Sequence, residues 1–282
     1  MPELPEVEII TRDLRTRVVG RTIRRFRASW KRQIKPNITV VQRALQGATI
    51  TQVTRRGKWI VFHVGGRNLS IGVLAVHLRM SGRILWESAA AEEPEHLRAF
   101  WEFDRGGRLL FCDARKFGRI ELIPTMNELD RRLGLEPLGP TFTVPALRAL
   151  FSKSARKLKP LLLDQTLIAG LGNIYTDEAL FRARLHPLER ADRLGDTAIR
   201  SLHRAIVHVL REAIQNNGTS FDWVYPGGRM QQSLRVYGHE GQPCRRCKTA
   251  IVYFRVAQRG THICPRCQVP GVESTSSIPL KG

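Results

Sequence analysis

The chain has 282 residues, and its 46 Lys and Arg against 25 Asp and Glu give a formal net charge of +21. This length allows two or three domains, and the positive charge indicates a nucleic-acid partner, because Lys and Arg neutralise phosphates. The chain contains no apolar run near the roughly 18 residues of a membrane span, no basic amphipathic anchor helix and no basic start typical of a signal peptide. We therefore expect a soluble, cytoplasmic protein.

The first eight residues, MPELPEVE, are acidic although the chain is basic. They contain Glu3, Glu6 and Glu8 and precede the first basic residue, Arg12. Apolar residues recur at helical spacing and predict a helix that ends near Gly20: Val7, Ile10, Leu14 and Val18. Glutamates in a first turn complement the helix dipole, so a helix start alone accounts for Glu6 and Glu8.

Pro2 permits a second interpretation of the same segment. If Met1 is removed, the Pro2 nitrogen becomes a secondary amine at the chain terminus. Such an α-amino group has a pKa near 8, against about 10.4 for lysine, so a useful fraction is uncharged at neutral pH. Uncharged amines form Schiff bases with carbonyl carbons. An amine beside carboxylates on a basic protein therefore suggests chemistry on nucleic acid.

After this helix the chain contains short β-type runs separated by glycines and charges. We expect strands at 59–64, 100–103 and 108–112, with a turn at 104–107. Strands at this spacing predict a sandwich or a barrel. The segment 89–94 is expected to form a loop.

A mainly helical part begins after Pro124. Pro145 is expected to open one helix, and apolar residues between 199 and 213 give another helix a buried face, with Asp196 or Thr197 as its cap. Between them, the glycine-bearing turn at 169–175 leads into a further helix. Backbone amides at that helix start suit phosphate binding, although a simple turn between helices also explains the pattern.

Four of the five cysteines are arranged as two pairs, Cys244-x2-Cys247 and Cys264-x2-Cys267, with 16 residues between the pairs. This spacing is typical of a structural zinc site with four thiolate ligands. Two disulfides are the alternative, which a reducing compartment disfavours. The fifth cysteine, Cys112, is expected to be a buried apolar residue.

The segment between the two cysteine pairs predicts a hairpin. Its strands are expected at 251–256 and 261–263, with Arg259 and Gly260 in the turn. From residue 229 to the end, nine Lys and Arg accompany two Glu. A basic zinc hairpin is suited to contact nucleic acid.

Together these segments resemble the formamidopyrimidine-DNA glycosylase (Fpg/MutM) family, bacterial repair enzymes for oxidised purines. The matching motifs occur in order from Pro2 to about Gln268. They are MPELPEVE at 1–8, RGK at 56–58, HLRMSG at 77–82, DARKFG at 113–118, AGLGNIY at 169–175, VYG at 236–238, the four cysteines and the pair Gln258-Arg259.

The resemblance implies an α+β protein of three domains. These are an N-terminal catalytic β-sandwich with flanking helices at 1–124, a helical helix–two-turn–helix (H2TH) domain at 125–228, and a zinc-finger hairpin with a tail at 229–282. It implies one structural Zn²⁺ and a double-stranded DNA partner containing oxidised bases or abasic sites, held in a cleft between the two halves. We expect a monomer associated with the bacterial nucleoid.

The resemblance also implies the catalytic roles. Pro2 would attack C1′ of the damaged nucleotide, displace the base and form a Schiff base, and Glu3 would act as general acid on the opening sugar. Glu6 would help to order the site. Lys58 would contact the phosphate backbone of the DNA and assist proton transfer, although composition alone would describe it as a solvated cation. Arg259 would assist the later of the β- and δ-eliminations.

Extruding a nucleotide from the stack leaves a space that the protein fills. By resemblance Met80, Arg115 and Phe117 fill it, since apolar side chains can enter a base stack and an arginine can pair with the orphaned base. Without the resemblance, core packing would be the simpler interpretation of Met80 and Phe117. Four further positions match DNA contacts of the family: His96, Lys159, Asn173 and Tyr237.

The sequence departs from the family pattern in three places. Arg79 replaces a common glycine and Ala114 a usual proline, which puts local loop geometry in doubt. The segment 218–230, which corresponds to the lesion-reading loop, is shorter and different. The preferred damaged base is therefore open.

Two alternatives stay open from the sequence. One is the sister endonuclease VIII type, which acts on oxidised pyrimidines with the same proline chemistry; Leu4 and the space-filling trio favour the purine enzyme. The other is a non-catalytic, zinc-dependent protein that binds damaged DNA, from which Pro2, Glu3 and Lys58 together are not expected.

Overall fold

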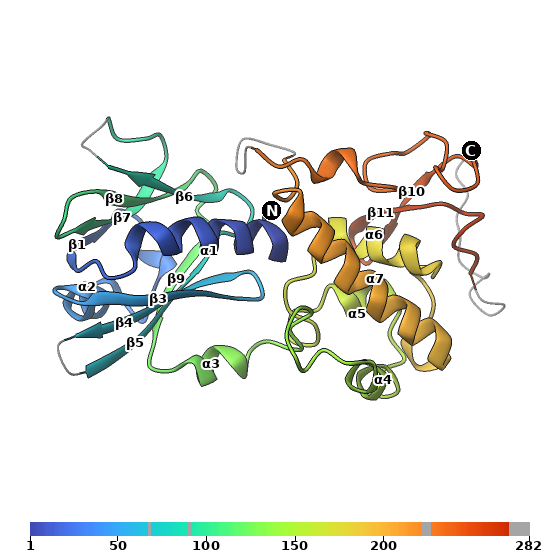
Figure 1. Cartoon of the computed structure of the whole chain (residues 1–282), viewed down its shortest axis with the longest axis horizontal. Coiled ribbons are helices and arrows are strands. Elements are labelled where there is room, and N and C mark those ends of the chain that lie inside the picture. The colour runs from blue at the N-terminus through green and yellow to red at the C-terminus, as the bar shows by residue number, and fades with distance from the viewer. Residues whose placement is uncertain (67–68, 89–91, 221–226, 271–282) are drawn as a thin grey trace. The chain divides into compact units, whose positions relative to one another are not determined.

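The computed structural model describes residues 1–66, 69–88, 92–220 and 227–270 (Figure 1). The chain divides into a first unit, residues 1–132 with 217–228, and a second unit, residues 133–216 with 229–282. The helices of the described residues are too short or too polar to span a lipid bilayer. The fold is mixed α+β, with the large sheets in the first unit and most of the helices in the second.

Two sheets form the body of the first unit. One sheet has the strand order β1-β7-β8-β6 and the other the order β2-β9-β5-β4-β3, and all neighbours are antiparallel except β2 and β9. The strands are β1 (Ile23–Ala28), β2 (Ile34–Lys35), β3 (Thr49–Arg56), β4 (Trp59–Gly66), β5 (Leu69–His77), β6 (Gly82–Glu87), β7 (Leu97–Phe103), β8 (Arg108–Asp113) and β9 (Arg119–Ile123).

Helices close the two open sides of this sandwich. Helix α1 (Leu4–Val18) packs against the edge strands β3 and β6, as Figure 1 shows, and α2 (Ile38–Leu45) packs against β1 and β2. A single apolar cluster joins both sheets and both helices, with Phe62 and Trp101 among its large buried side chains. The remaining short helices of this unit are η1 (Lys31–Gln33) and α3 (Met126–Asp130).

The predicted elements of the first unit are confirmed. The helix ends at Val18, before Gly20, whose positive φ of 79° favours glycine. The strand expected at 59–64 is β4, and those expected at 100–103 and 108–112 lie in β7 and β8. Cys112 is 1% exposed. Of the loop expected at 89–94, residues 89–91 lie outside the described part.

The second unit is a group of helices with a small hairpin. Its elements are α4 (Val144–Phe151), α5 (Leu158–Leu162), α6 (Asn173–Ala183), η2 (Ala191–Arg193), α7 (Asp196–Gln215), η3 (Met230–Gln232), β10 (Val252–Val256) and β11 (Arg259–Ile263). Pro145 lies in the first turn of α4, as predicted. The predicted cap of α7 is wrong: Gly195 is the N-cap, and Asp196 lies in the first turn, where its charge complements the helix dipole.

The predicted turn of the hairpin is also wrong. Val256 pairs with Arg259, so the two turn residues are Ala257 and Gln258, and Arg259 and Gly260 begin β11. Ala257 and Gln258 have φ of 46° and 63°. Two successive positive φ values match the twist of a two-residue hairpin, although glycine or asparagine is more usual there. The glycine of this hairpin lies in β11, after the turn, so a turn expected at the glycine comes too late in the chain.

Candidate functional site

The start of α1 gathers three of the predicted catalytic residues, Pro2, Glu3 and Glu6. All three are buried, and Glu3 and Glu6 are each 2% exposed. Glu3 is the N-cap, and its backbone N–H donates to Glu6 Oε2 at 2.8 Å, as in a capping box. Met1 is 40% exposed. The residue whose removal frees the Pro2 nitrogen is therefore accessible, while the neighbouring carboxylates are held inside.

Glu6 also holds a distant segment of the first unit. Its Oε1 accepts from the backbone N–H of Thr219 at 2.9 Å and from the Thr219 hydroxyl at 3.1 Å. Gly218 has a φ of 68°, and a Cβ atom there would lie 2.7 Å from Glu6 Oε1. Thr219 as a partner of Glu6, and Gly218 as its close neighbour, were not predicted, because no local pattern links segments so far apart in the chain. The segment expected to read the lesion continues into 221–226, which lie outside the described residues.

Lys58 is not the solvated cation that composition alone describes. It is 4% exposed and directly precedes Trp59 at the start of β4. His77 pairs with Trp59 across the sheet, and their rings are 4.9 Å apart at right angles. Burial, and then the positive charges of Arg79, Lys58 and Arg119, hold the pKa of His77 well below its usual value. A buried ammonium group thus stands near a histidine kept neutral.

Glu8 belongs to the structure of the helix, as predicted. It accepts from Arg12 Nε at 2.8 Å and from Arg55 Nε at 2.9 Å, and Arg55 is itself mostly buried. Burial opposes ionisation, but these hydrogen bonds outweigh it and lower the pKa of Glu8. Glu8 therefore anchors α1 to β3.

The proposed space-filling residues occupy two loops and are exposed. Met80 is 40% and Phe117 51% exposed, so the core-packing interpretation is wrong for both. The guanidinium carbon of Arg115 lies 4.9 Å from the centre of the Phe117 ring. The His96 side chain is also exposed and lies 3.2 Å from Glu95. Exposed apolar side chains beside an arginine are suited to enter a base stack.

The Arg79 departure has a structural consequence. Arg79 has a φ of 56°, in the left-handed region that favours glycine, so a glycine at this position would be the less strained choice. The backbone N–H of Arg79 donates to His77 Nδ1 at 3.0 Å. The loop therefore keeps a defined geometry despite the larger side chain.

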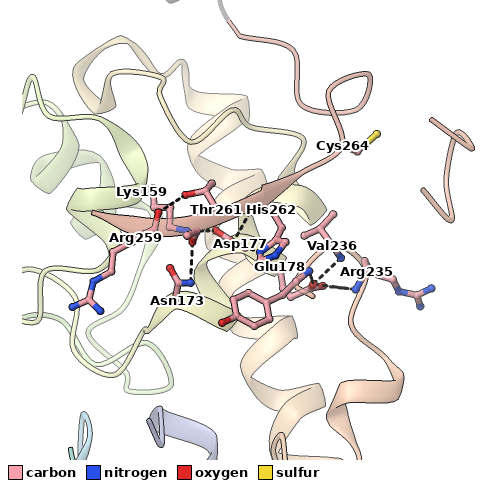
Figure 2. Close-up of polar contacts among 12 residues, drawn as sticks. Lys159, Asn173, Asp177, Glu178, Arg235, Val236, Arg259, Thr261, His262 and Cys264 are labelled. Atoms are coloured by element: carbon pink, nitrogen blue, oxygen red, sulfur yellow. Dashed lines mark hydrogen bonds and ion pairs between the residues drawn. The ribbon is translucent and has the colours of Figure 1, made fainter. Parts of the chain in front are cut away.

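In the second unit, Lys159 and Asn173 contact the start of β11, from which the Arg259 side chain extends away from both residues (Figure 2). Asn173 Nδ2 donates to the Gly260 carbonyl oxygen at 2.9 Å, and Lys159 Nζ donates to the same oxygen at 2.7 Å. Lys159 Nζ also donates to Asp177 Oδ1 at 2.6 Å, and both side chains are buried. Arg259 is exposed. Two predicted DNA contacts thus hold the backbone beside the predicted elimination residue, and a phosphate contact by Lys159 itself stays a prediction.

Glu178 is a second buried carboxylate on α6, and no sequence motif marked it as part of the site. Its Oε1 accepts from the backbone N–H groups of Arg235, Val236 and Tyr237 at 2.9–3.0 Å (Figure 2). Burial raises the pKa of Glu178, although these hydrogen bonds act in the opposite direction. Tyr237, a predicted DNA contact, is therefore fixed through its backbone, and its ring lies 4.9 Å from that of His262.

The four paired cysteines come together as the sequence predicts. Their Sγ atoms all lie within 4.8 Å of one another, and the separations include 3.3 Å for Cys247 with Cys264 and 4.0 Å for Cys244 with Cys267. A tetrahedral site with Zn–S bonds of about 2.3 Å separates its sulfurs by about 3.8 Å. Disulfide sulfurs lie about 2.05 Å apart, so these distances fit the zinc interpretation and not the disulfide alternative.

The zinc module is attached to the helices of the second unit. Cys244 and Cys264 are buried in an apolar cluster with Phe181 of α6. Gln268 is fully buried, accepts from the Cys264 backbone N–H at 3.1 Å and donates to the Leu185 carbonyl oxygen at 2.9 Å. The metal site therefore holds β10 and β11, and with them Arg259, against α6.

Family models match three parts of the chain. They are described as the formamidopyrimidine-DNA glycosylase N-terminal domain over residues 1–120, the H2TH domain of the same enzyme over 133–223, and a zinc finger found in FPG and IleRS over 241–269.

Similar proteins and structures carry the same description. Formamidopyrimidine-DNA glycosylases of Enterococcus faecalis and Heliobacterium modesticaldum are 41% and 44% identical, and each match covers 95% of this chain with 97% and 100% of the relative. The structure of Lactococcus lactis Fpg with DNA containing an abasic site has a TM-score of 0.87 at 38% identity and covers 95% of this chain and 99% of that chain. A MutM structure with DNA containing carbocyclic 8-oxo-G has a TM-score of 0.87 at 38% identity and covers 95% and 100%.

Proposed function

The chain belongs to the formamidopyrimidine-DNA glycosylase family, and from this premise we infer that it is a base-excision repair enzyme, both a DNA glycosylase and an AP lyase. Its substrate is double-stranded DNA that contains oxidised purines or abasic sites. Solved relatives with DNA containing an abasic site, N7-benzyl-Fapy-dG or carbocyclic 8-oxo-G support this substrate class. The match over residues 1–120 includes Pro2, Glu3 and Lys58, which favours the enzyme over a non-catalytic binding protein.

The observation that carries the proposed mechanism is the arrangement at the start of α1, where Pro2 directly precedes a buried carboxylate pair. The nitrogen of processed Pro2 attacks C1′ while the glycosidic bond breaks and the base leaves. Glu3 donates a proton to the opening sugar, and a Schiff base forms between C1′ and the Pro2 nitrogen. Glu6 orders the site through its hydrogen bonds to Glu3 and Thr219.

The Schiff base acidifies the C2′ protons, so loss of one of them expels the 3′ phosphate by β-elimination, and δ-elimination then expels the 5′ phosphate. Buried Lys58 contacts the phosphate backbone of the DNA and assists proton transfer. Arg259 assists the second elimination. Arg259 suits this role because it is exposed at the start of β11. Asn173 and Lys159 hold this part of the strand by donating to the carbonyl oxygen of the next residue, Gly260. The four paired cysteines would hold a zinc ion as a structural cross-link between two short loops.

Contacts with the base stack of the DNA complete the proposed mechanism. Met80, Arg115 and Phe117 fill the space that the extruded nucleotide leaves, and the two apolar side chains are exposed as this role requires.

We also infer that the protein acts as a monomer at the nucleoid, where its substrate is. Sedimentation of the purified protein as a dimer would contradict the monomer.

Borohydride trapping on abasic-site DNA tests the mechanism, because borohydride reduces a Schiff base to a stable amine. The wild-type protein, with Met1 removal verified by mass spectrometry, is expected to form a covalent adduct, and Pro2→Gly is expected to trap poorly. Pro5→Ala is the matched control, since Pro5 lies in the first turn of α1 without a terminal nitrogen. Absence of an adduct from the processed wild-type protein would refute the Schiff-base mechanism. Competition between 8-oxoguanine and oxidised-pyrimidine duplexes tests the substrate class.

A further inference from the structure

We propose that Asp113 is a positioning residue that holds the two loops of the first unit carrying Met80 and Phe117 in their space-filling arrangement. Asp113 ends β8 and is fully buried, although it carries an acidic side chain. The proposal rests on the function proposed above, because it assigns no chemistry to Asp113 and concerns only the residues that replace the extruded nucleotide.

The side chain of Asp113 connects three separate segments. Its Oδ1 accepts from the Ser81 hydroxyl at 2.5 Å, next to Met80. Its Oδ2 accepts from the backbone N–H of Gly118 at 2.7 Å, next to Phe117, and from Gln33 Nε2 at 2.8 Å. One carboxylate therefore joins the Met80 loop and the Phe117 loop, and Gln33 fixes the orientation of the carboxylate.

The connection extends to Arg115 and His96. The backbone N–H of Arg115 donates to Ser81 Oγ at 3.1 Å, so Ser81 both donates to Asp113 and accepts from the loop that follows it. The backbone N–H of Asp113 donates to the His96 carbonyl oxygen at 3.0 Å. Asp113 and its partner Ser81 therefore bind the backbone at Arg115 and His96, in addition to their bonds beside Met80 and Phe117.

The two loops need such a restraint because their backbones are not in relaxed conformations. Arg79 and Lys116 have φ of 56° and 59°, which L side chains rarely adopt. Gly118 leaves no room for a side chain, since a Cβ atom there would lie 2.4 Å from the Phe111 ring and 3.1 Å from Asp113 Oδ2. Strained loops keep one geometry only when their surroundings determine it, and here Asp113 supplies the acceptors that do so.

The side-chain partners of Asp113 are themselves buried, but Ser81 directly follows exposed Met80 and Gly118 directly follows exposed Phe117. Asp113 thus restrains the points at which the two exposed loops enter the buried part of the unit. Loss of the carboxylate is therefore expected to misplace the space-filling side chains more than to unfold the sheets. It should impair only those steps in which a base stack is opened.

The test compares two substrates. Excision of 8-oxoguanine from duplex DNA under single-turnover conditions requires the space-filling residues. Borohydride trapping on a single-stranded abasic oligonucleotide requires the Pro2 chemistry but has no stack to open. The variants are Asp113→Asn and the milder Ser81→Ala, and thermal unfolding is measured for each. Asp104→Asn is the matched control, because it removes the same charge from the exposed turn at the other end of β8.

Asp113→Asn is expected to slow duplex excision by at least about tenfold, the factor that 1.4 kcal/mol represents, with single-stranded trapping close to wild type. Ser81→Ala should show the same pattern with a smaller loss, and it decides the matter if Asp113→Asn does not fold. Unchanged duplex excision in both variants would overturn the proposal. So would a parallel loss of both activities and of thermal stability. Failure of the wild-type protein to trap at all would instead refute the proposed function.

Discussion

Acidification is expected to destabilise the first unit through His77. The residue is 6% exposed, its Nδ1 accepts from the Arg79 backbone, and burial together with the charges of Arg79, Lys58 and Arg119 lowers its pKa well below 6.5. Because the pKa is lower in the folded state, the unfolded state binds the extra proton first as pH falls. The stabilisation from neutral His77 is therefore complete above about pH 6.5 and is lost progressively below it.

The size of this effect follows from linkage. One group that is protonated only in the unfolded state changes the free energy of unfolding by about 1.4 kcal/mol per pH unit. Each pH unit below about 6.5 is thus expected to remove up to about 1.4 kcal/mol of stability through His77, until the pH reaches the lowered pKa of the folded state. In His77→Gln this contribution to the pH dependence of the free energy of unfolding should disappear, even though the variant is less stable at neutral pH.

Urea unfolding, followed by tryptophan fluorescence at several pH values, measures this pH dependence for the first unit alone. Residues 133–216 and 229–282, which make up the second unit, contain no tryptophan in their sequence, so the signal reports the first unit. His96→Gln is the control, because His96 is in the same unit and its side chain is exposed. Equal pH slopes for the wild type and His77→Gln would refute the reasoning, since the buried ring would then titrate alike in both states.

Two further substitutions test the metal site and the contact of Glu6. Cys264→Ser is expected to lower zinc content in metal analysis and to weaken DNA binding, while the tryptophan-monitored unfolding of the first unit stays unchanged; full-strength DNA binding by this variant would contradict the role of the hairpin. Gly218→Ala is expected to reduce borohydride trapping, because the residue has a φ of 68° and the new Cβ would lie 2.7 Å from Glu6 Oε1. Trapping at the wild-type level would show that Glu6 does not need this contact.

Local features of this protein were predictable where neighbours along the chain decide them. The helix at the N-terminus, the strands β4 and β8 and the paired cysteines follow from periodicity and spacing. The hairpin turn was misplaced by two residues, because Ala257 and Gln258 adopt positive φ values that their residue types do not announce. The cap of α7 was misplaced, because Gly195 offers no side chain that marks it.

In the candidate site, too, the sequence motifs identified residues, but tertiary contacts set the environment of those residues. The resemblance named Pro2, Glu3 and Lys58 from short motifs, but the burial of Lys58 beside a neutral His77 depends on contacts between strands. The exposure of Met80 and Phe117 could not be inferred from their apolar character, which is equally typical of a core. These properties arise from which surfaces the fold covers.

By itself, the sequence determined the family, the zinc ligands and the order of the elements, because motifs and short spacings persist whatever the rest of the chain does. Only the tertiary structure decided how the site is held. Asp113 collects Gln33, Ser81 and Gly118, and Glu6 reaches Thr219 from the opposite part of the chain. A buried carboxylate must find donors wherever the fold brings them, so its partners are set by packing and not by their distance in sequence.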